Sequence, residues 1–316
     1  MKILITGGLG FIGSNLVAEL GKNHEIDIVD GFTNEYLGYT HIHRGSKGLD
    51  NLNDIEKKHR DLNLKYRLNI IKGKFKNIYN HWSYHVNSMI ELYKNNYDLV
   101  INCGSLSEAI LSQYYPVFTY NSIVRGTHRI RKTFVDVPMI HLSSSMVYGT
   151  WEGQIDEQYS LGFVDYYGDC KTKAESRCGN NDVILRPIHV YGMGDGKFPI
   201  WMNLERQIAN NKPFNLEAAS CIYIDDFVLA IKNILDNWNP GIYNISYDFI
   251  RSIEPIKEIY PKNFDHKIKL GPTGKPRGSL DSSKLLDTFG ITFIHKDYES
   301  TIKDYYGKYE NFCQKQ

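Results

Sequence analysis

Short apolar segments alternate with longer amphipathic ones along the first 190 residues of the chain. The apolar segments are three to six residues long and rich in Ile, Val and Leu, which is typical of strands buried on both faces. They predict strands at residues 2–6, 25–30, 68–72, 98–103, 139–143 and 183–185, and a first helix over residues 13–20. Strands that alternate with helices in this way favour parallel pairing through right-handed crossovers. We therefore expect an α/β fold with a Rossmann-type, doubly wound parallel sheet.

Two regions depart from this alternation. Residues 34–67 are polar, and residues 41–77 contain ten Lys or Arg against four Asp or Glu. This segment is either a solvated insertion with one helix at residues 51–60 or a basic flap over an anionic ligand.

After residue 187 the elements become short and are separated by Pro and Gly. We expect a larger domain with the doubly wound sheet at residues 1–186 and a smaller, α+β lobe at 187–316, with residues 222–246 returning to the main sheet.

The composition excludes several classes of protein. The 316 residues carry 37 Lys or Arg and 36 Asp or Glu, so there is no basic field to hold nucleic acid or an anionic membrane. No apolar stretch approaches the ~20 residues of a membrane span. The five cysteines form no metal-binding or disulfide pattern, and we expect no metal site. The first residues, MKILITGG, resemble a strand rather than a signal peptide, which predicts a cytoplasmic protein.

A glycine-rich turn follows the first predicted strand and opens the first helix. In this turn Gly7 permits the tight bend, Gly10 lets the backbone approach a pyrophosphate, and Gly13 allows close packing of helix on strand. The positive end of the helix dipole then faces the anion. Asp30 ends the second strand, where its carboxylate can accept both ribose hydroxyls and would repel a 2′-phosphate. The turn therefore predicts NAD rather than NADP as cofactor.

Tyr167 and Lys171 are four residues apart on a predicted helix, which places phenol and ammonium on one face. A cation about 6 Å away lowers a phenol pKa by roughly 2 units at an effective dielectric of 20. We therefore expect Lys171 to tune Tyr167 towards proton transfer at neutral pH. The hydroxyl of Ser144 follows the strand at 139–143, at the sheet edge where parallel sheets bind ligands.

Taken together, these motifs resemble the extended short-chain dehydrogenases/reductases of the nucleotide-sugar epimerase/dehydratase family. The resemblance covers nearly the whole chain. It rests on TGGLGFIG (6–13), Asp30, the strand at 100–104, the segment 115–121 with Gly126-Thr127, SSSMVYG (143–149), Tyr-x-x-x-Lys (167–171), LRPIHVYG (185–192), YIDD (223–226) and GIYNI (241–245).

The resemblance implies roles for individual residues. Tyr167 would be the acid/base, Lys171 would bind the nicotinamide ribose, and Ser144 would hydrogen-bond the reacting sugar oxygen, while Asn121 supports the site. The cofactor site would comprise Gly7, Gly10, Phe11, Ile12, Gly13, Asp30, Ser105, Tyr167 and Lys171. The substrate site would comprise Ser107, Ser144, Ser145, His189 and Arg277, with residues 189–199 lining the nucleotide diphosphate. A homodimer built from the helices at 115–133 and 167–177 is also implied.

Four positions depart from the family pattern. The Asp-Glu pair of sugar-nucleotide dehydratases is replaced by Ser145 and Met146, which disfavours dehydration. His189 stands where relatives often have Asn at the diphosphate. Ala219-Ser220-Cys221 lacks the family's phosphate-binding Arg, for which Arg277 is the remaining candidate. Gly73-Lys74 follows the expected third strand where relatives have Gly-Asp at the adenine.

The favoured function is an NAD-dependent oxidoreductase acting at C4 of a nucleotide-linked sugar, specifically a 4-epimerase. A 4-dehydrogenase or 4-ketoreductase that releases its product is the alternative. A non-catalytic dinucleotide-binding protein is a further one, although such proteins typically lose the Tyr or the Lys. Bacterial relatives suggest a place in polysaccharide synthesis.

Overall fold

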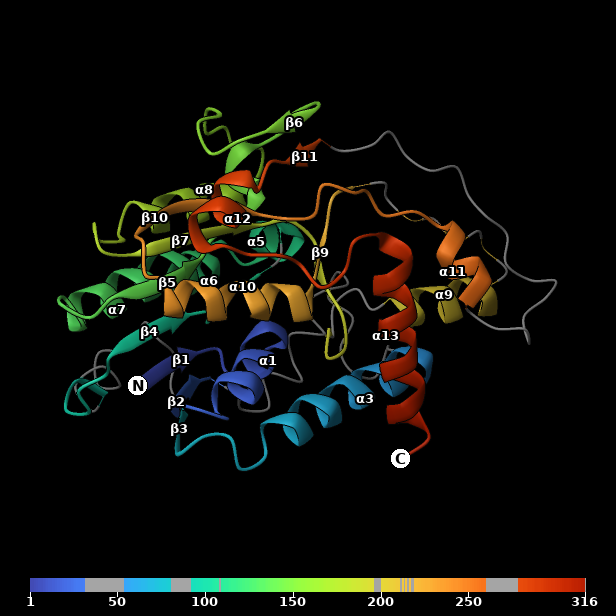
Figure 1. Cartoon of the computed structure of the whole chain (residues 1–316), viewed down its shortest axis with the longest axis horizontal. Coiled ribbons are helices and arrows are strands. Elements are labelled where there is room, and N and C mark those ends of the chain that lie inside the picture. Colours follow the sequence, from blue (N-terminus) through green and yellow to red (C-terminus); the bar gives the residue numbers. More distant parts are fainter. Residues whose placement is uncertain are drawn as a thin grey trace.

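Among the residues that the structure describes, seven parallel strands form a central sheet (Figure 1). The computed structural model describes residues 1–31, 54–80, 92–107, 109–195, 200–210, 212, 214, 216, 219–259 and 278–315. In spatial order the strands are β10 (Gly241–Ile245), β7 (Val183–Pro187), β5 (Met139–Leu142), β4 (Leu99–Asn102), β1 (Lys2–Thr6), β2 (Glu25–Asp30) and β3 (Asn77–Asn80). The predicted doubly wound α/β fold is confirmed.

The chain reverses its direction of travel across the sheet between β1 and β4. From β1 it moves outwards through β2 to β3, then returns to β4 beside β1 and continues through β5 and β7 to β10. Thr6 and Asn102, the last residues of β1 and β4, are register partners. This reversal is called the switch point of the sheet. Open α/β sheets bind ligands in a crevice at the switch point, outside the carboxyl ends of the strands.

Helices cover both faces of the sheet because successive strand residues point to opposite sides. Ile3 and Ile5 of β1 lie in a buried cluster with residues of α1 and α10, two helices on the side nearer the viewer in Figure 1. Leu4 belongs instead to a cluster with Ile130 and Phe134 at α7. The main helices are α1 (Phe11–Leu20), α3 (Asp54–Ile71), α5 (Ala109–Tyr114), α6 (Pro116–Tyr120), α7 (Gly126–Thr133), α8 (Tyr166–Glu175), α10 (Ile224–Asp236) and α12 (Ser283–Phe289).

The smaller elements lie beyond the carboxyl ends of the strands and beside α3. Helices α9 (Ile200–Ala209) and α13 (Tyr298–Cys313) share an aromatic cluster in which Trp201 packs against Tyr305 and Tyr309. Helix α11 (Glu254–Ile259) packs against α13. The short parallel pairs are β8 (Val190–Tyr191) with β9 (Ile222–Tyr223) and β6 (Gln154–Ile155) with β11 (Ser279–Leu280).

The strand predicted at residues 68–72 is wrong. Residues 68–71 form the last turn of α3, residue 72 lies just after the helix, and the third strand is β3, at residues 77–80. The apolar run of Leu68–Ile71 is too short to distinguish a strand from the end of a helix by periodicity. Gly73-Lys74 therefore does not mark the end of a strand; that place belongs to Asn80, the register partner of Asp30.

The basic segment can be compared with its two interpretations only from Asp54 onwards. Residues 34–53 lie outside the described part of the chain. From Asp54 the helix continues to residue 71, well past the predicted end at 60, and it packs against α1 and α9. One side of α3 is buried, so this part of the segment is neither a solvated insertion nor a flap.

The helix predicted at residues 115–133 is continuous but not uniform. Between α6 and α7, residues Asn121–Arg125 form a π-helical turn, η2. Asn121 begins this turn, and helix α8 packs against the turn. Turns of this type inside α-helices are frequent at functional sites.

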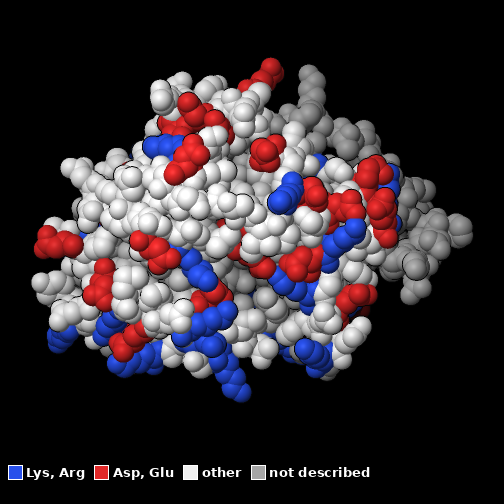
Figure 2. Space-filling view, in the orientation of Figure 1, with Lys and Arg blue, Asp and Glu red and all other residues white. Residues whose placement is uncertain are grey.

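Surface charge is mixed. On the face drawn in Figure 2, acidic and basic side chains are interspersed, in keeping with the near-zero net charge. Within the described residues, none of the helices combines the length and the apolar character needed to cross a membrane.

Candidate active site

The glycine turn between β1 and α1 is shaped to admit an anion. Gly7 has φ 68°, a conformation that favours glycine, and a Cβ on Gly13 would lie 2.1 Å from the carbonyl oxygen of Gly7. Helix α1 begins after Gly10, and no side chain caps its first turn. Its first amide groups and its dipole therefore face the crevice, as a dinucleotide diphosphate requires. Phe11 and Ile12, in the first turn of α1, pack against the core instead.

The turns that follow β1 and β4 are held together across the switch point. A Cβ on Gly7 would lie 2.7 Å from Cα of Gly104, so the two backbones are in direct contact. The Thr6 hydroxyl donates to Asn102 Oδ1 (2.8 Å) and accepts from the Gly104 amide (3.0 Å). This buried network fixes the floor of the crevice, since its polar groups satisfy one another.

Asp30 lies at the end of β2, next to the glycine turn. Its Oδ2 accepts a hydrogen bond from the Leu9 amide (2.9 Å), and the residue is 5% exposed. Burial raises the pKa of this carboxyl to about 6, against the opposing effects of the Leu9 hydrogen bond and the charge of Arg67. Such a carboxylate lies where an adenosine ribose would be met in this fold.

The helix that carries Tyr167 and Lys171 is capped by Asp165, whose Oδ1 accepts from the Gly168 amide (2.8 Å). Both side chains are buried, and Lys171 Nζ lies 5.7 Å from the centroid of the Tyr167 ring. Lys171 Nζ donates to the Leu142 carbonyl (2.8 Å) and to Ser105 Oγ (3.0 Å). These bonds fix the ammonium at the carboxyl ends of β4 and β5.

The pKa of Tyr167 differs from the expectation. Burial raises the pKa of the phenol well above its ordinary value, and a hydrogen bond with Ser144 lowers it only in part. The predicted net lowering by Lys171 is therefore wrong for the ligand-free chain, because desolvation of the phenolate outweighs the nearby charge. Burial therefore favours the protonated phenol in the ligand-free chain, and the phenolate form increases only as the pH rises.

Gly168 sets the distance between α8 and the turn that carries Ser144. A Cβ on Gly168 would lie 2.6 Å from the Met146 carbonyl oxygen, in the 3₁₀ turn η3 (Ser145–Tyr148) that Ser144 caps. The Gly168→Ala variant is thus expected to push the two elements apart, losing about tenfold or more in catalytic rate and about 1–3 kcal/mol of stability. Steady-state kinetics and denaturant unfolding would measure both. A variant with unchanged kinetics would show that this spacing does not matter.

The residues predicted for the substrate are only partly brought together. Ser144 and the buried Ser145 lie at η3, close to Tyr167, and Ser107 is exposed after β4. His189 follows β7 with φ 38°, a conformation that is uncommon for a residue other than glycine and is often found at functional sites. Arg277 and residues 196–199 lie outside the described part of the chain.

A buried ion pair behind the site was not foreseen. Glu175, one turn beyond Lys171, receives two hydrogen bonds from Arg186 of β7 and one from the Ser143 hydroxyl. Arg186 also donates to the Tyr148 hydroxyl (2.9 Å). This pair ties α8 to β5, β7 and η3. The sequence alone does not show that these two residues pair: Glu175 follows the Tyr-x-x-x-Lys motif by one helical turn, and Arg186 lies in LRPIHVYG.

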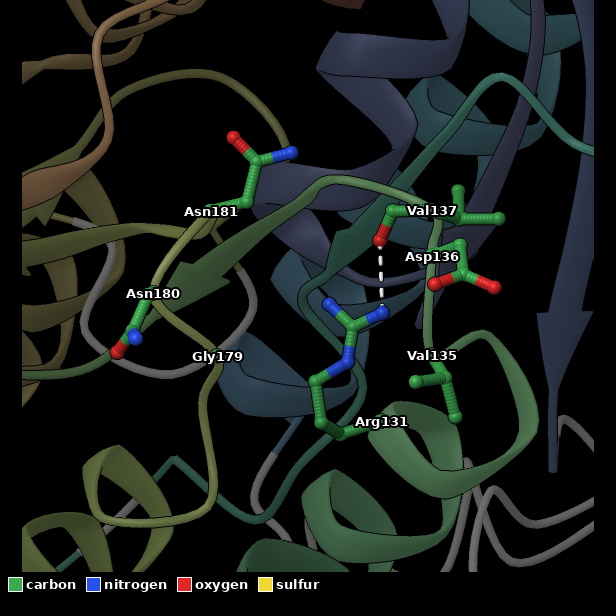
Figure 3. Close-up of a pocket in the computed structure, with 7 residues that line it drawn as sticks. All are labelled: Arg131, Val135, Asp136, Val137, Gly179, Asn180 and Asn181. Atoms are coloured by element: carbon green, nitrogen blue, oxygen red, sulfur yellow. Dashed lines mark hydrogen bonds between the residues drawn. The ribbon is translucent and has the colours of Figure 1, made fainter.

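Figure 3 shows a pocket of about 330 Å³ elsewhere on the molecule. It lies between the end of α7 and the loop before β7, at the amino ends of the strands and therefore opposite the crevice. Arg131 lines it, but the guanidinium already donates to Asp182 (2.7 Å) and to the Val137 carbonyl (2.8 Å). The pocket is separate from the candidate active site.

The protein combines a doubly wound sheet with a glycine turn at its switch point and a buried Tyr-x-x-x-Lys pair beside a Ser. This combination is that of an extended short-chain dehydrogenase/reductase. The comparison with known families agrees. The sequence profile of the NAD dependent epimerase/dehydratase family matches residues 3–246, and the chain belongs to this family. NAD is accordingly its cofactor.

Individual relatives are more distant. The "Uncharacterized UDP-glucose epimerase YtcB" of Bacillus subtilis is 26% identical over 252 residues, which cover 74% of this chain and 72% of the relative. The crystal structure of UDP-glucuronic acid 4-epimerase from Bacillus cereus in complex with NAD has a TM-score of 0.75 at 19% identity and covers 99% of both chains. UDP-glucose 4-epimerase from Thermotoga maritima, with UDP-glucose, has a TM-score of 0.74 at 19% identity, covering 98% of this chain and 99% of that one.

Proposed function

We propose that this protein is an NAD-dependent 4-epimerase of a nucleotide-linked sugar. The observation that carries the proposal is that Lys171, beside Tyr167, hydrogen-bonds at the carboxyl ends of β4 and β5, where Ser144 also lies. The relatives named for UDP-glucose and UDP-glucuronic acid support a UDP-sugar as the first substrate to test.

The proposed chemistry assigns one proton transfer to each half-reaction. NAD, when bound, supplies a reversible acceptor for the hydride of C4. Tyr167, in its phenolate form, takes the proton of the C4 hydroxyl as the carbon becomes a ketone, and Ser144 hydrogen-bonds the same oxygen. Tyr167 returns its proton when hydride comes back to the opposite face, which inverts the configuration. Lys171 stabilises the phenolate and holds the ribose of the cofactor.

We assign the remaining sequence-predicted residues to the same two sites. The turn with Gly7, Gly10 and Gly13 would bind the diphosphate of the cofactor, with Phe11 and Ile12 beside it. Asp30 would bind the adenosine ribose. Ser105 would act at the nicotinamide end through its hydrogen bond with Lys171. Ser107, Ser145, His189 and Arg277 remain proposed substrate contacts. Ser145 and Met146 offer no acid or base for dehydration, which supports epimerisation over 4,6-dehydration.

The proposal is tested by incubating the protein with NAD and UDP-, GDP-, CDP- and dTDP-sugars, and following absorbance at 340 nm together with the sugar products. We expect the C4 epimer of one sugar to form without net NADH. Accumulation of NADH with a released keto sugar would instead identify a 4-dehydrogenase. Reduction of a supplied 4-keto sugar alone would identify a ketoreductase, and no conversion of any sugar would contradict the enzymatic role.

The same proposal includes a cytoplasmic homodimer that serves polysaccharide synthesis. Support for the dimer comes from apolar side chains exposed at α5 and α6, where Val117 is 74% and Tyr114 63% exposed. Support for the compartment comes from the five cysteines, which are all free thiols.

A further inference from the structure

One buried phenol holds the far end of the turn that Ser144 opens. Tyr148 is the last residue of η3 and is 2% exposed. Its hydroxyl donates to Asn244 Oδ1 of β10 (2.7 Å) and accepts from Arg186 Nη1 of β7 (2.9 Å). Asn244 and Arg186 are register partners on neighbouring strands. The main sheet therefore fixes this hydroxyl with both a donor and an acceptor.

The ring of Tyr148 is held as well as its hydroxyl. The guanidinium of Arg186 lies 4.8 Å from the ring centroid. Trp151 and Tyr159 contact the ring edge-on, with centroid distances of 6.1 and 6.2 Å. A buried polar group whose partners are all in place specifies a single position. The proposed proton transfers do not use this phenol, so its role is one of position.

Asn244 is itself fixed by the chain that follows η3. The residue is fully buried in β10. Its Nδ2 donates to the Ile155 carbonyl (3.4 Å), and its backbone amide donates to Glu157 Oε1 (2.6 Å). Because Nδ2 is engaged in this way, the side chain presents Oδ1 to Tyr148 in one orientation.

The near end of the turn is tied to the sheet too. The backbone amide of Ser143 donates to the Leu185 carbonyl of β7 (2.8 Å). Within the turn, the Met146 amide donates to Ser144 Oγ (3.2 Å). The hydroxyl of Ser144 thus belongs to a short segment that is anchored to β7 at its start and to β7 and β10 at Tyr148.

We propose that Tyr148 is a positioning residue, which holds the hydroxyl of Ser144 in place beside Tyr167 by fixing the end of η3. The inference rests on the proposed role of Ser144 at the reacting sugar oxygen. The turn packs directly on α8, the helix of Tyr167, so a shift of the turn moves one group against the other. A displacement of about 1 Å at a reacting centre can cost about 10²-fold in rate.

The first test is a cycle of variants of the full-length protein with NAD and its active sugar. Tyr148→Phe should lower kcat about tenfold and keep the sugar KM and the NAD affinity within about twofold. Ser144→Ala should lower kcat about 10²-fold. Tyr148→Phe added to Ser144→Ala should cost less than about twofold more, because the hydroxyl to be positioned is gone. Equal losses in both backgrounds would overturn the inference.

Two further variants sharpen this cycle. Asn244→Leu removes the acceptor on β10 and should reproduce the loss in kcat, again only while Ser144 is present. Tyr159→Phe removes the same atom from a ring that is 40% exposed and should leave kcat unchanged. Wild-type kcat and KM in both Tyr148→Phe and Asn244→Leu would overturn the inference.

Amide hydrogen exchange, followed by mass spectrometry without sugar or NAD, tests the anchoring itself. Residues 143–149 should exchange about tenfold faster in Tyr148→Phe than in the wild type, while residues 2–6 of β1 keep the wild-type rate. Unchanged exchange at 143–149, or equally faster exchange in β1, would overturn the inference. A wild type that converts no sugar would contradict the proposed epimerase instead, and the exchange result would still decide whether Tyr148 holds the turn.

Discussion

Tyr167→Phe is expected to lower the rate of sugar conversion by about 10²–10⁴-fold and to leave NAD binding unchanged. The substitution removes one hydroxyl from a ring that is 6% exposed and keeps the apolar contacts of the ring. The proton of the sugar hydroxyl then has no acceptor on α8. Product formation from the active nucleotide sugar measures the rate, and calorimetry with NAD measures binding.

The preceding residue supplies a matched control. Tyr166 begins the same helix, and Tyr166→Phe removes the same atom without touching the proposed acid/base, so its rate should stay close to that of the wild type. Because burial raises the pKa of the Tyr167 phenol, wild-type kcat/KM should rise with pH across the neutral range. A Tyr167→Phe protein that keeps both the rate and this rise would remove the phenol from the mechanism.

The sheet and the dinucleotide turn could be predicted because each is specified by local sequence. Strands such as Lys2–Thr6 and Glu25–Asp30 are buried on both faces and read as apolar runs bounded by polar residues. The turn requires glycine at fixed spacings for steric reasons, and Gly13 lies so close to Gly7 that no other residue fits. Such constraints are visible in a single sequence.

The error at residues 68–72 has a different origin. A four-residue segment with three apolar residues satisfies a strand pattern and the last turn of an amphipathic helix equally well. Had the helix been continued past residue 60, the spacing of His59, Asn63 and Arg67 would have placed them on one face. Nothing local, however, shows that this polar face is buried, because burial depends on α9 and on the turn at Gly194.

The candidate site was only partly predictable for the same reason. The spacing of Tyr167 and Lys171 is local, but the contact of Lys171 with Ser105 joins α8 to the end of β4. The pKa of Tyr167 likewise depends on how deeply tertiary packing buries the phenol, which the sequence does not specify. The charge of Lys171 alone therefore does not predict the direction in which the pKa of Tyr167 changes.

Glu175→Gln is expected to destabilise the protein by about 3–5 kcal/mol. Glu175 and Arg186 are 8% and 2% exposed, and two parallel hydrogen bonds of 2.9 and 2.6 Å join them. The amide keeps the shape of the carboxyl group but leaves the guanidinium charge buried without compensation. Denaturant unfolding measures the loss, and a free energy within about 1 kcal/mol of the wild type would contradict it.

Two further variants separate the cost of the orphaned charge from a general effect of changing α8. Asp169→Asn breaks the pair with Lys173 on the solvent side of the same helix and should cost no more than about 0.5 kcal/mol. Replacing Glu175 and Arg186 together by Met removes both charges and should cost less than Glu175→Gln alone. That order of stabilities follows from the desolvated charge, since the double variant loses more hydrogen bonds and yet leaves no ion unpaired.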